Sequence, residues 1–163
     1  CWAFRHRTPT RCLNLALDTF TSSGTIVIAP QDVLLDEDTV LQPDVFWIAP
    51  DGACTETETN YTGAPDFVAE VLSPSTAIND KREKFQKYEQ HGVREYWIAE
   101  PTAQYLEVWQ RVDDTFQRLG IFDSTNRFRS MLFDADIAVS AIFPSTSKTQ
   151  WITKWFAWCQ LLY

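Results

Sequence analysis

The sequence predicts an α/β domain with a mixed central sheet flanked by helices. Three observations support this fold class. Runs rich in β-branched and aromatic residues recur along the chain, two internal segments repeat their apolar residues at helical spacing, and one of these segments joins two strand-like runs. A succession of strand, helix and strand implies a parallel crossover, whereas the later runs are joined by short turns typical of antiparallel hairpins.

The length and composition fit one domain that covers residues 1–163. The chain is 45% hydrophobic and 14% aromatic and has only 5 glycines, which is typical of a globular protein. A chain of this size buries roughly 70% of its unfolded surface in one core. The formal net charge of -8 disfavours a nucleic-acid partner unless bound cations or a local basic face compensate it.

The cysteines and the hydropathy predict a cytoplasmic protein without a membrane partner. Cys1, Cys12, Cys54 and Cys159 form no Cys-x-x-Cys pair and have no histidine partners at zinc-site spacing. This dispersal favours neither a structural zinc site nor a disulfide framework, and a reducing compartment is the simplest interpretation. No run reaches the ~20 apolar residues that a transmembrane helix needs.

The first half of the chain contains one helical pattern and several short strands. Apolar residues at positions 13, 17 and 20 follow i, i+4, i+7 spacing, which predicts an amphipathic helix over residues 9–21. Residues 25–30, 32–36 and 43–50 have the composition of consecutive strands in one sheet. Residues 51–63 are rich in Thr, Glu, Asn and Gly, so we expect a flexible loop there.

The second half begins with a strand over residues 66–73, followed by the second helical pattern. Ile78, Phe85 and Tyr88 have helical spacing, and Gly92 provides a helix stop, so we expect a helix of about 14 residues. The remaining predicted strands, which form a meander, cover residues 93–101, 105–112, 115–122 and 128–133.

A tryptophan-rich helical extension is predicted over residues 145–163. Trp151, Trp155, Trp158 and Leu162 follow i, i+4, i+7, i+11 spacing, which gives the helix an aromatic stripe. This stripe favours docking on its own domain or on a twin subunit, and we therefore expect a homodimer. A membrane-surface helix is less favoured because Lys154 is the only cation after residue 150.

Two acids interrupt the strand "APDFVAEVLSPST", residues 64–76. Residues two apart in a strand share a face, so Asp66 and Glu70 point the same way. Burying an ionised carboxylate among apolar residues costs several kcal/mol unless it meets a cation or a donor. A metal ion would be such a partner. The alternatives are that Glu70 pairs with a lysine or arginine, or that it lies on a solvent face.

A second acid and a helical lysine could approach Glu70. Asp44 follows a proline at the start of another apolar strand and could reach Glu70 across the sheet. Clusters of oxygen ligands suit Mg²⁺ or Mn²⁺ rather than zinc. Asp80, Lys84 and Tyr88 lie at i, i+4, i+8 on one side of the predicted helix. Lys84 could reach the carboxylates, or it could form an ordinary i, i+4 pair with Asp80 on a solvated face.

Five ordered blocks of the sequence resemble the Uma2 family (DUF820), restriction-endonuclease-like proteins of the PD-(D/E)XK nuclease superfamily. The resemblance is close over residues 29–101 and looser on either side of them. The blocks are "APQDVLLD", "VLQPDVFWIAP", "GAPDFVAEVLSPST", "DKREKFQKY" and "HGVREYWIAEP". The resemblance implies a restriction-endonuclease-like fold in which an Asp at the start of one strand and an acid on the next bind the metal.

Carried onto this chain, the resemblance assigns Asp44 and Glu70 as catalytic metal ligands, with the backbone carbonyl of Val71 as a third ligand. Leu72 stands where the superfamily places a lysine. Uma2-like proteins commonly carry D-x3-K-x3-Y on the following helix, which identifies Lys84 as the relocated catalytic lysine. The resemblance gives supporting roles to Asp66, Asp80 and Tyr88.

The implied function is that of a Mg²⁺- or Mn²⁺-dependent endonuclease that hydrolyses phosphodiester bonds of DNA. The family also carries an acid-containing segment before the first helix, and no such segment precedes Trp2 in this sequence, so we expect a domain without it. The alternative function is a catalytically weak or inactive nuclease-fold protein that binds a protein or nucleic acid. A purely structural sheet domain would explain the ordered blocks poorly.

Overall fold

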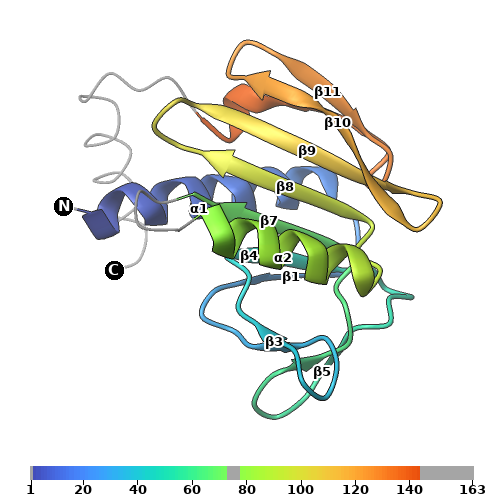
Figure 1. Ribbon diagram of the computed structural model, residues 1–163. Helices are drawn as coiled ribbons and strands as arrows, with labels where there is room; N and C mark the ends of the chain where they lie inside the picture. Colours follow the sequence, from blue (N-terminus) through green and yellow to red (C-terminus); the bar gives the residue numbers. More distant parts are fainter. Residues whose placement is uncertain (1, 73–77, 144–163) are drawn as a thin grey trace, which may run out of the picture.

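The computed structural model describes residues 2–72 and 78–143, and within residues 2–9 and 78–81 it describes the backbone alone. Its central element is a six-stranded sheet with the order β1-β4-β7-β8-β9-β10 (Figure 1). Only the β7–β8 pair of this sheet is parallel. The strands are β1 (Thr25–Ile28), β4 (Val45–Ile48), β7 (Phe67–Val71), β8 (Glu95–Glu100), β9 (Tyr105–Val112) and β10 (Thr115–Asp123).

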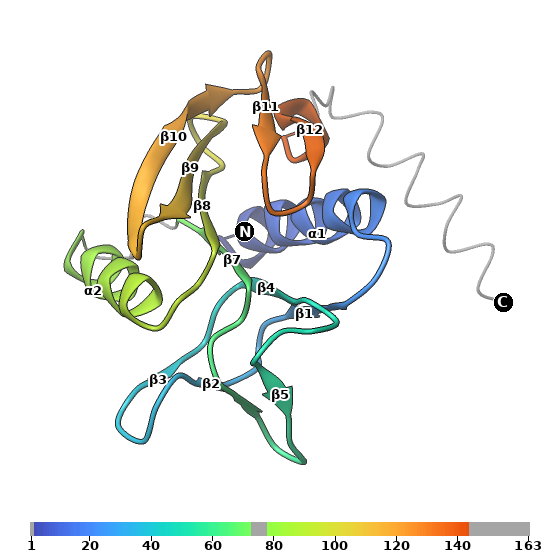
Figure 2. The same ribbon diagram turned by 90° about the vertical axis from the view of Figure 1, so that its right-hand side faces the viewer.

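Two helices cover opposite faces of this sheet. The helix α1 (Trp2–Phe20) buries Leu13 and Leu17 against Val45, Phe67 and Trp97 on one face. The helix α2 (Ile78–Gln90) connects β7 to β8 and lies on the other face (Figure 2). Its Tyr88 is buried in the cluster on that face. The predicted α/β class with a mixed sheet, a parallel crossover and flanking helices is therefore confirmed.

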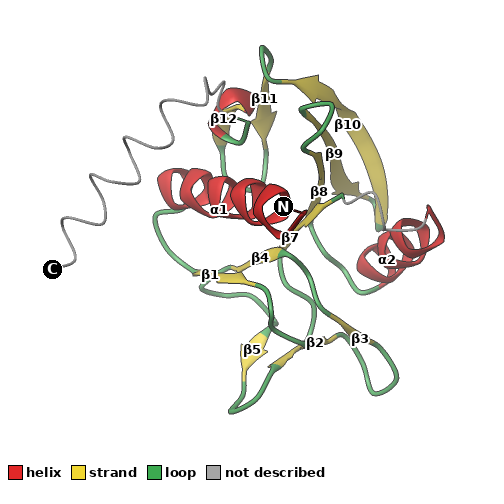
Figure 3. Ribbon diagram, turned by 90° about the vertical axis from the view of Figure 1, so that its left-hand side faces the viewer, coloured by secondary structure: helices red, strands yellow, loops and turns green. Residues whose placement is uncertain are grey.

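Two smaller sheets lie beside the central one (Figure 3). One has the order β3-β2-β6-β5 and the other pairs two strands of the last hairpin. Their strands are β2 (Val33–Leu34), β3 (Val40–Leu41), β5 (Thr55–Glu56), β6 (Tyr61–Thr62), β11 (Arg127–Ser130) and β12 (Ala135–Ala138). A short 3-10 helix, η1 (Val139–Ala141), follows β12 near the end of the described chain.

The structure corrects the sequence analysis in the first half of the chain. The first helix begins at Trp2 rather than at residue 9. The strand expected at 32–36 does not join the central sheet, because Pro30, which has no amide hydrogen, interrupts the chain after β1 and β2 pairs with β3 and β6 instead. The loop expected at 51–63 contains β5 and β6, because Tyr61 is buried and its amide donates to the Asp32 carbonyl.

The predicted meander ends after β10, and a buried acid links the following hairpin to the central sheet. Glu95 is 1% exposed at the start of β8, on the face that α1 covers. Its carboxylate accepts hydrogen bonds from Trp97 Nε1 at 2.8 Å and from Ser130 Oγ, at the end of β11, at 2.9 Å. The β11–β12 hairpin is thereby fastened over the sheet instead of extending its edge. The helix expected over residues 145–163 lies outside the described residues.

Candidate active site

The strand register places Asp44 directly opposite Glu70. In the antiparallel β4–β7 pair, Val45 faces Ala69, so the preceding residue, Asp44, faces Glu70. The Asp44 carbonyl accepts the Ala29 amide from the β1 side, so the backbone groups of Asp44 point away from β7. Asp44 and Glu70 are therefore a non-hydrogen-bonded pair, the kind in which the two Cα atoms come closest and the side chains lie side by side.

The Asp44 carboxylate is held by the backbone of the residue that follows Glu70. The Val71 amide donates to Asp44 Oδ2 at 2.7 Å. The Leu72 amide donates in the other direction, to the Ala99 carbonyl on β8. Because the N–H and C=O of one strand residue point to the same side, the Val71 carbonyl also points toward the Asp44 side of β7. Two carboxylates and one carbonyl therefore converge at the end of β7.

Helix α2 provides two donors to Glu70. Lys84 Nζ lies 3.1 Å from Glu70 Oε1 and 3.0 Å from Oε2. Tyr88, one helical turn further on, is fully buried, and its hydroxyl donates to Glu70 Oε1 at 2.8 Å. The position of α2 over β7 in Figure 1 makes these contacts possible. Of the two alternatives left open for Lys84, the structure therefore has the contact with the carboxylate.

Burial makes Glu70 an unusual carboxylate. Only 8% of the residue is exposed, and this desolvation raises the pKa of Glu70 from 4.5 to about 7 against the attraction of Lys84. The neighbouring charge of Asp44 also raises the pKa, and the Tyr88 hydrogen bond lowers it. Desolvation, followed by the charge of Glu70, raises the pKa of Tyr88 well above its ordinary value, so its hydroxyl remains a donor. The Glu70 carboxylate, whose charge is costly to bury, therefore lies where β4, β7 and α2 meet.

Not all predicted site residues join this cluster. Asp66 lies at the start of β7, where its Oδ2 accepts the Ala49 amide at 2.8 Å and its Oδ1 lies 3.3 Å from Arg94. Glu70 is four residues further along the strand, about 13 Å away at the usual rise. Asp80 is in the first turn of α2, and its side chain is outside the described part of the structure. Leu72 packs against the apolar cluster on the α2 face.

The Uma2 profile, described as "Putative restriction endonuclease", matches residues 5–140. The chain belongs to the Uma2 family. No protein with a curated description matches it. Among solved structures, the Uma2 chain is similar to a protein of Anabaena variabilis ATCC 29413 described as "a putative nuclease belonging to DUF820". The TM-score is 0.68 at 15% identity, and the match covers 85% of this chain and 80% of the other. This likeness confirms the predicted fold.

The residues of the candidate site fit a divalent cation with oxygen ligands. Asp44 and Glu70 are adjacent, and the negative charge of Asp44 beside the buried Glu70 carboxylate makes a cation favourable there. Among the described residues no group of three or more His, Cys, Asp or Glu side chains could hold a metal. A metal at this site would therefore need the Val71 carbonyl, and water or substrate oxygens, to complete its coordination.

One further acid, which the sequence did not predict at the site, lies on the same face of the sheet. Glu107 on β9 faces Ile98, which in turn faces Glu70, so Glu107 lies two strands from Glu70. It is 8% exposed, and its Oε1 lies 3.6 Å from Arg118. The signal was the alternation of "YLEVWQRV", which puts Glu107 and Trp109 on one face, but the face that α2 covers could not be identified from that stretch alone.

Proposed function

We propose that this Uma2 protein is a metal-dependent endonuclease that hydrolyses phosphodiester bonds of DNA. The observation that carries the proposal is the direct pairing of Asp44 with Glu70 at the end of β7, with Lys84 within 3.1 Å of the Glu70 carboxylate. Two adjacent acids and a lysine beside a strand end are the groups that metal-assisted phosphodiester hydrolysis requires. The family description and the nuclease-like neighbour support the same reaction class.

The proposed ligands are Asp44, Glu70 and the Val71 carbonyl, and the proposed ion is Mg²⁺ or Mn²⁺. When bound there, such an ion would lower the pKa of a bound water and neutralise charge on the scissile phosphate. The Val71 amide keeps Asp44 Oδ2 in place, and Tyr88 orients Glu70 Oε1. Lys84 carries the positive charge that would offset the negative charge developing on the phosphate.

A bound cation also addresses the net charge of the chain. A protein with a formal charge of -8 repels a polyanion in solution. Divalent ions at a carboxylate site reverse the local field, so the phosphate would be attracted where the acids lie. We expect DNA binding to depend on the divalent ion rather than on a basic surface alone.

The test is cleavage of supercoiled plasmid by the purified chain with Mg²⁺ or Mn²⁺. We expect nicking that Glu70→Gln abolishes, whereas the matched control Glu83→Gln, an exposed acid on α2, keeps it. The melting temperature should rise with Mn²⁺ in the parent protein and in the control only. No cleavage with any divalent ion, together with an unchanged melting temperature, would contradict the proposal.

A second candidate function is that of a catalytically weak nuclease-fold protein that binds a protein or nucleic acid. Two observations favour it: Leu72 replaces the superfamily lysine, and Lys84 already compensates Glu70 without a metal. Fluorescence anisotropy with labelled DNA in EDTA separates the two functions. Tight DNA binding without a divalent ion, combined with no cleavage when one is added, would favour the binding protein.

The homodimer, the cytoplasmic location and the single domain over residues 1–163 stay predictions. No helix in the described part of the chain is long and apolar enough to cross a membrane. Sedimentation velocity of the full chain and of a version that ends at residue 150 would test the dimer. We expect the shorter chain to sediment as a monomer if the tryptophan stripe forms the subunit contact.

A further inference from the structure

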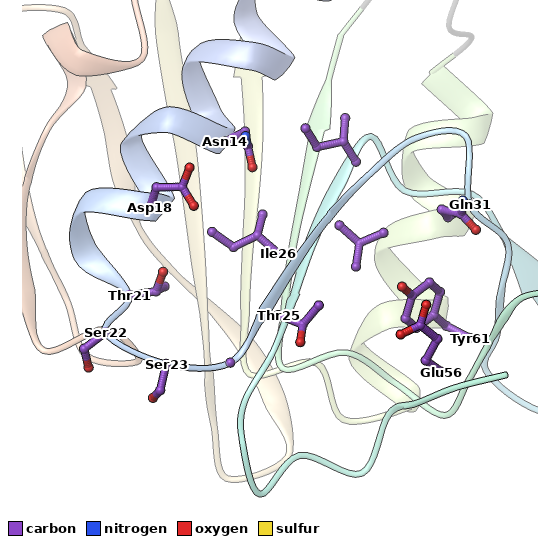
Figure 4. Close-up of a pocket in the computed structure, with 13 residues that line it drawn as sticks. Asn14, Asp18, Thr21, Ser22, Ser23, Thr25, Ile26, Gln31, Glu56 and Tyr61 are labelled. Carbon is purple, nitrogen blue, oxygen red and sulfur yellow. The ribbon is translucent and has the colours of Figure 1, made fainter.

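A cavity of about 740 Å³ lies beside the outer edge of β1, on the opposite side of that strand from β4 (Figure 4). Asn14 and Asp18 reach it from α1, and Glu56 and Tyr61 reach it from the β5–β6 hairpin. Hydroxyl side chains between α1 and β1 form much of the remaining wall. The site proposed above for metal binding uses none of these side chains.

The register of β1 shows which of its backbone groups face this cavity. The Ala29 amide donates to the Asp44 carbonyl, so Ala29 and Asp44 are a hydrogen-bonded pair of the antiparallel β1–β4 ladder. Such pairs recur at every second residue, which makes Val27 a hydrogen-bonded position as well. Ile26 and Ile28 therefore direct their amides and carbonyls outward, and both residues line the cavity. Within the described residues no other strand of the central sheet flanks this edge.

The edge lacks the features that usually keep another strand away. Exposed edge strands are commonly protected by charged residues, by proline or by a covering element. The strand "TIVI" contains neither a charge nor a proline, and Ile28 is 38% exposed. A cavity beside it leaves room for a chain to lie along the strand. An extended peptide is the ligand that fits a free strand edge, because its backbone completes the ladder.

The charges of the cavity select the kind of peptide. Among the described residues that line it, the charged side chains are Asp18 and Glu56, and both are acidic and exposed. Asp18 belongs to the helix on one face of the sheet, and Glu56 faces Tyr61, which packs in the cluster on the other face. A second copy pairing through β1 would bring like charges together, and nucleic acid would be repelled. A basic segment is complementary.

We propose that the β1 edge is a docking site for an extended basic segment of a partner protein, which adds a strand beside Ile26 and Ile28. Successive residues of a strand point to opposite faces. The segment must therefore present one basic side chain to Asp18 and another to Glu56, and these two residues are separated by an odd number of positions, as i, i+1 or i, i+3. This inference does not depend on the nuclease reaction.

The test uses blocked hexapeptides of one composition, TVKKVT, TKVVKT and TKVKVT, added to the full chain. The first two have odd lysine spacing and the third has even spacing. Hydrogen exchange followed by NMR should show slower exchange of the Ile26 and Ile28 amides with at least one odd-spaced peptide. That peptide should bind about five-fold more tightly than the even-spaced one, as expected for one extra exposed ion pair.

Variants of the protein separate charge from backbone pairing. Asp18→Asn combined with Glu56→Gln removes both ion pairs and should weaken binding of the odd-spaced peptide about 25-fold, whereas the charge-matched control Glu37→Gln with Asp38→Asn should not. Ile28→Pro removes one outward amide and should abolish the added protection at that edge. Three results would each overturn the proposal: equal binding of all three peptides, binding unaffected by the Asp18 and Glu56 changes, or no protection at Ile26 and Ile28. Protection that increases with protein concentration through self-association, and not with added peptide, would also overturn it.

Discussion

Asp44 and Glu70 face each other across β4 and β7 as a non-hydrogen-bonded pair, and the amide next to Glu70 holds the Asp44 carboxylate at 2.7 Å. This pairing brings two acids as close as neighbouring strands allow. The two acids have different hydrogen-bond partners, so mutations can test their roles separately. Asp44 accepts from a backbone amide, whereas Glu70 accepts from side chains of α2.

The substitution Asp44→Asn should remove the metal affinity while it retains the fold. The amide oxygen of asparagine can still accept the Val71 hydrogen bond, so we expect the free energy of unfolding to fall by less than about 1 kcal/mol. The rise in melting temperature with Mn²⁺ should disappear, because one negative ligand is gone. Differential scanning calorimetry with Mn²⁺ and with EDTA measures both effects. A retained Mn²⁺ shift would remove Asp44 from the ligand set.

The stability of the metal-free protein should depend on the ionisation of Glu70. Its pKa is about 7 in the folded state against 4.5 in the unfolded state, so the folded state binds more protons between these values. The free energy of unfolding therefore decreases as the pH rises from about 4.5 to 7, by on the order of 3 kcal/mol from this group. Urea unfolding in EDTA at pH 5 and pH 8 measures it, with Glu70→Gln as the comparison.

Glu70→Gln should show a smaller decrease over this pH range, because glutamine does not titrate. The same proton linkage predicts that the Mn²⁺ affinity of the parent protein increases as the pH rises through about 7, since a ligand carboxylate must be deprotonated. A parent protein and a variant with parallel stability curves between pH 5 and pH 8 would mean that Glu70 titrates at an ordinary pKa.

Asp66→Ala should reduce stability without changing metal binding. The substitution removes the acceptor of the Ala49 amide and should cost about 1–3 kcal/mol. Gly52→Ala should act on the same contact, because an added Cβ would lie 2.4 Å from Asp66 Oδ2. The neighbouring exposed acid provides the control Asp51→Ala. If Asp66→Ala lowered the Mn²⁺ affinity per folded molecule, Asp66 would belong to the site as the sequence analysis expected.

Glu95→Gln should be among the most destabilising single changes of an acid in this chain. The Glu95 carboxylate accepts from Trp97 on one oxygen and from Ser130 and Gln110 on the other, and it has no cationic partner among these. The NH₂ group of glutamine would meet donors, so we expect a loss of about 2–4 kcal/mol. Chemical unfolding measures the loss, and Glu100→Gln at the end of the same strand is the control. A change under about 1 kcal/mol would show that the hairpin does not depend on this carboxylate.

Local patterns predicted the central elements and the face on which the acids lie. The period of two in "DFVAEV" put Glu70 on one face, and the helical spacing of Lys84 and Tyr88 put both on one side of α2. What local patterns could not provide is the register between strands, which decides that Glu70 faces Asp44. The separation of Asp66 from the site could not be predicted for a similar reason. The alternation shows that Asp66 and Glu70 share a face, but a shared face does not bring two residues close together along the strand.

The small sheets were missed for a related reason. The polar stretch around Tyr61 contains too few apolar residues for a strand pattern, and its pairing with β2 depends on residues almost thirty positions earlier in the chain. Glu95 was missed because a single acid in an apolar strand gives no sign of the donors that meet it. Those donors come from β8, β9 and the hairpin beyond β10.

The contact between Lys84 and Glu70 would make the binding of a cation at this carboxylate an exchange of one positive charge for another. The Lys84 side chain is 19% exposed, whereas Tyr88 is fully buried and donates to Glu70 Oε1. An ion that took the carboxylate positions now held by Lys84 would have to displace its ammonium group, so its apparent affinity would be reduced by the strength of the ion pair. The lysine would then compete with the ion, and this competition would favour divalent ions over monovalent ones at Glu70.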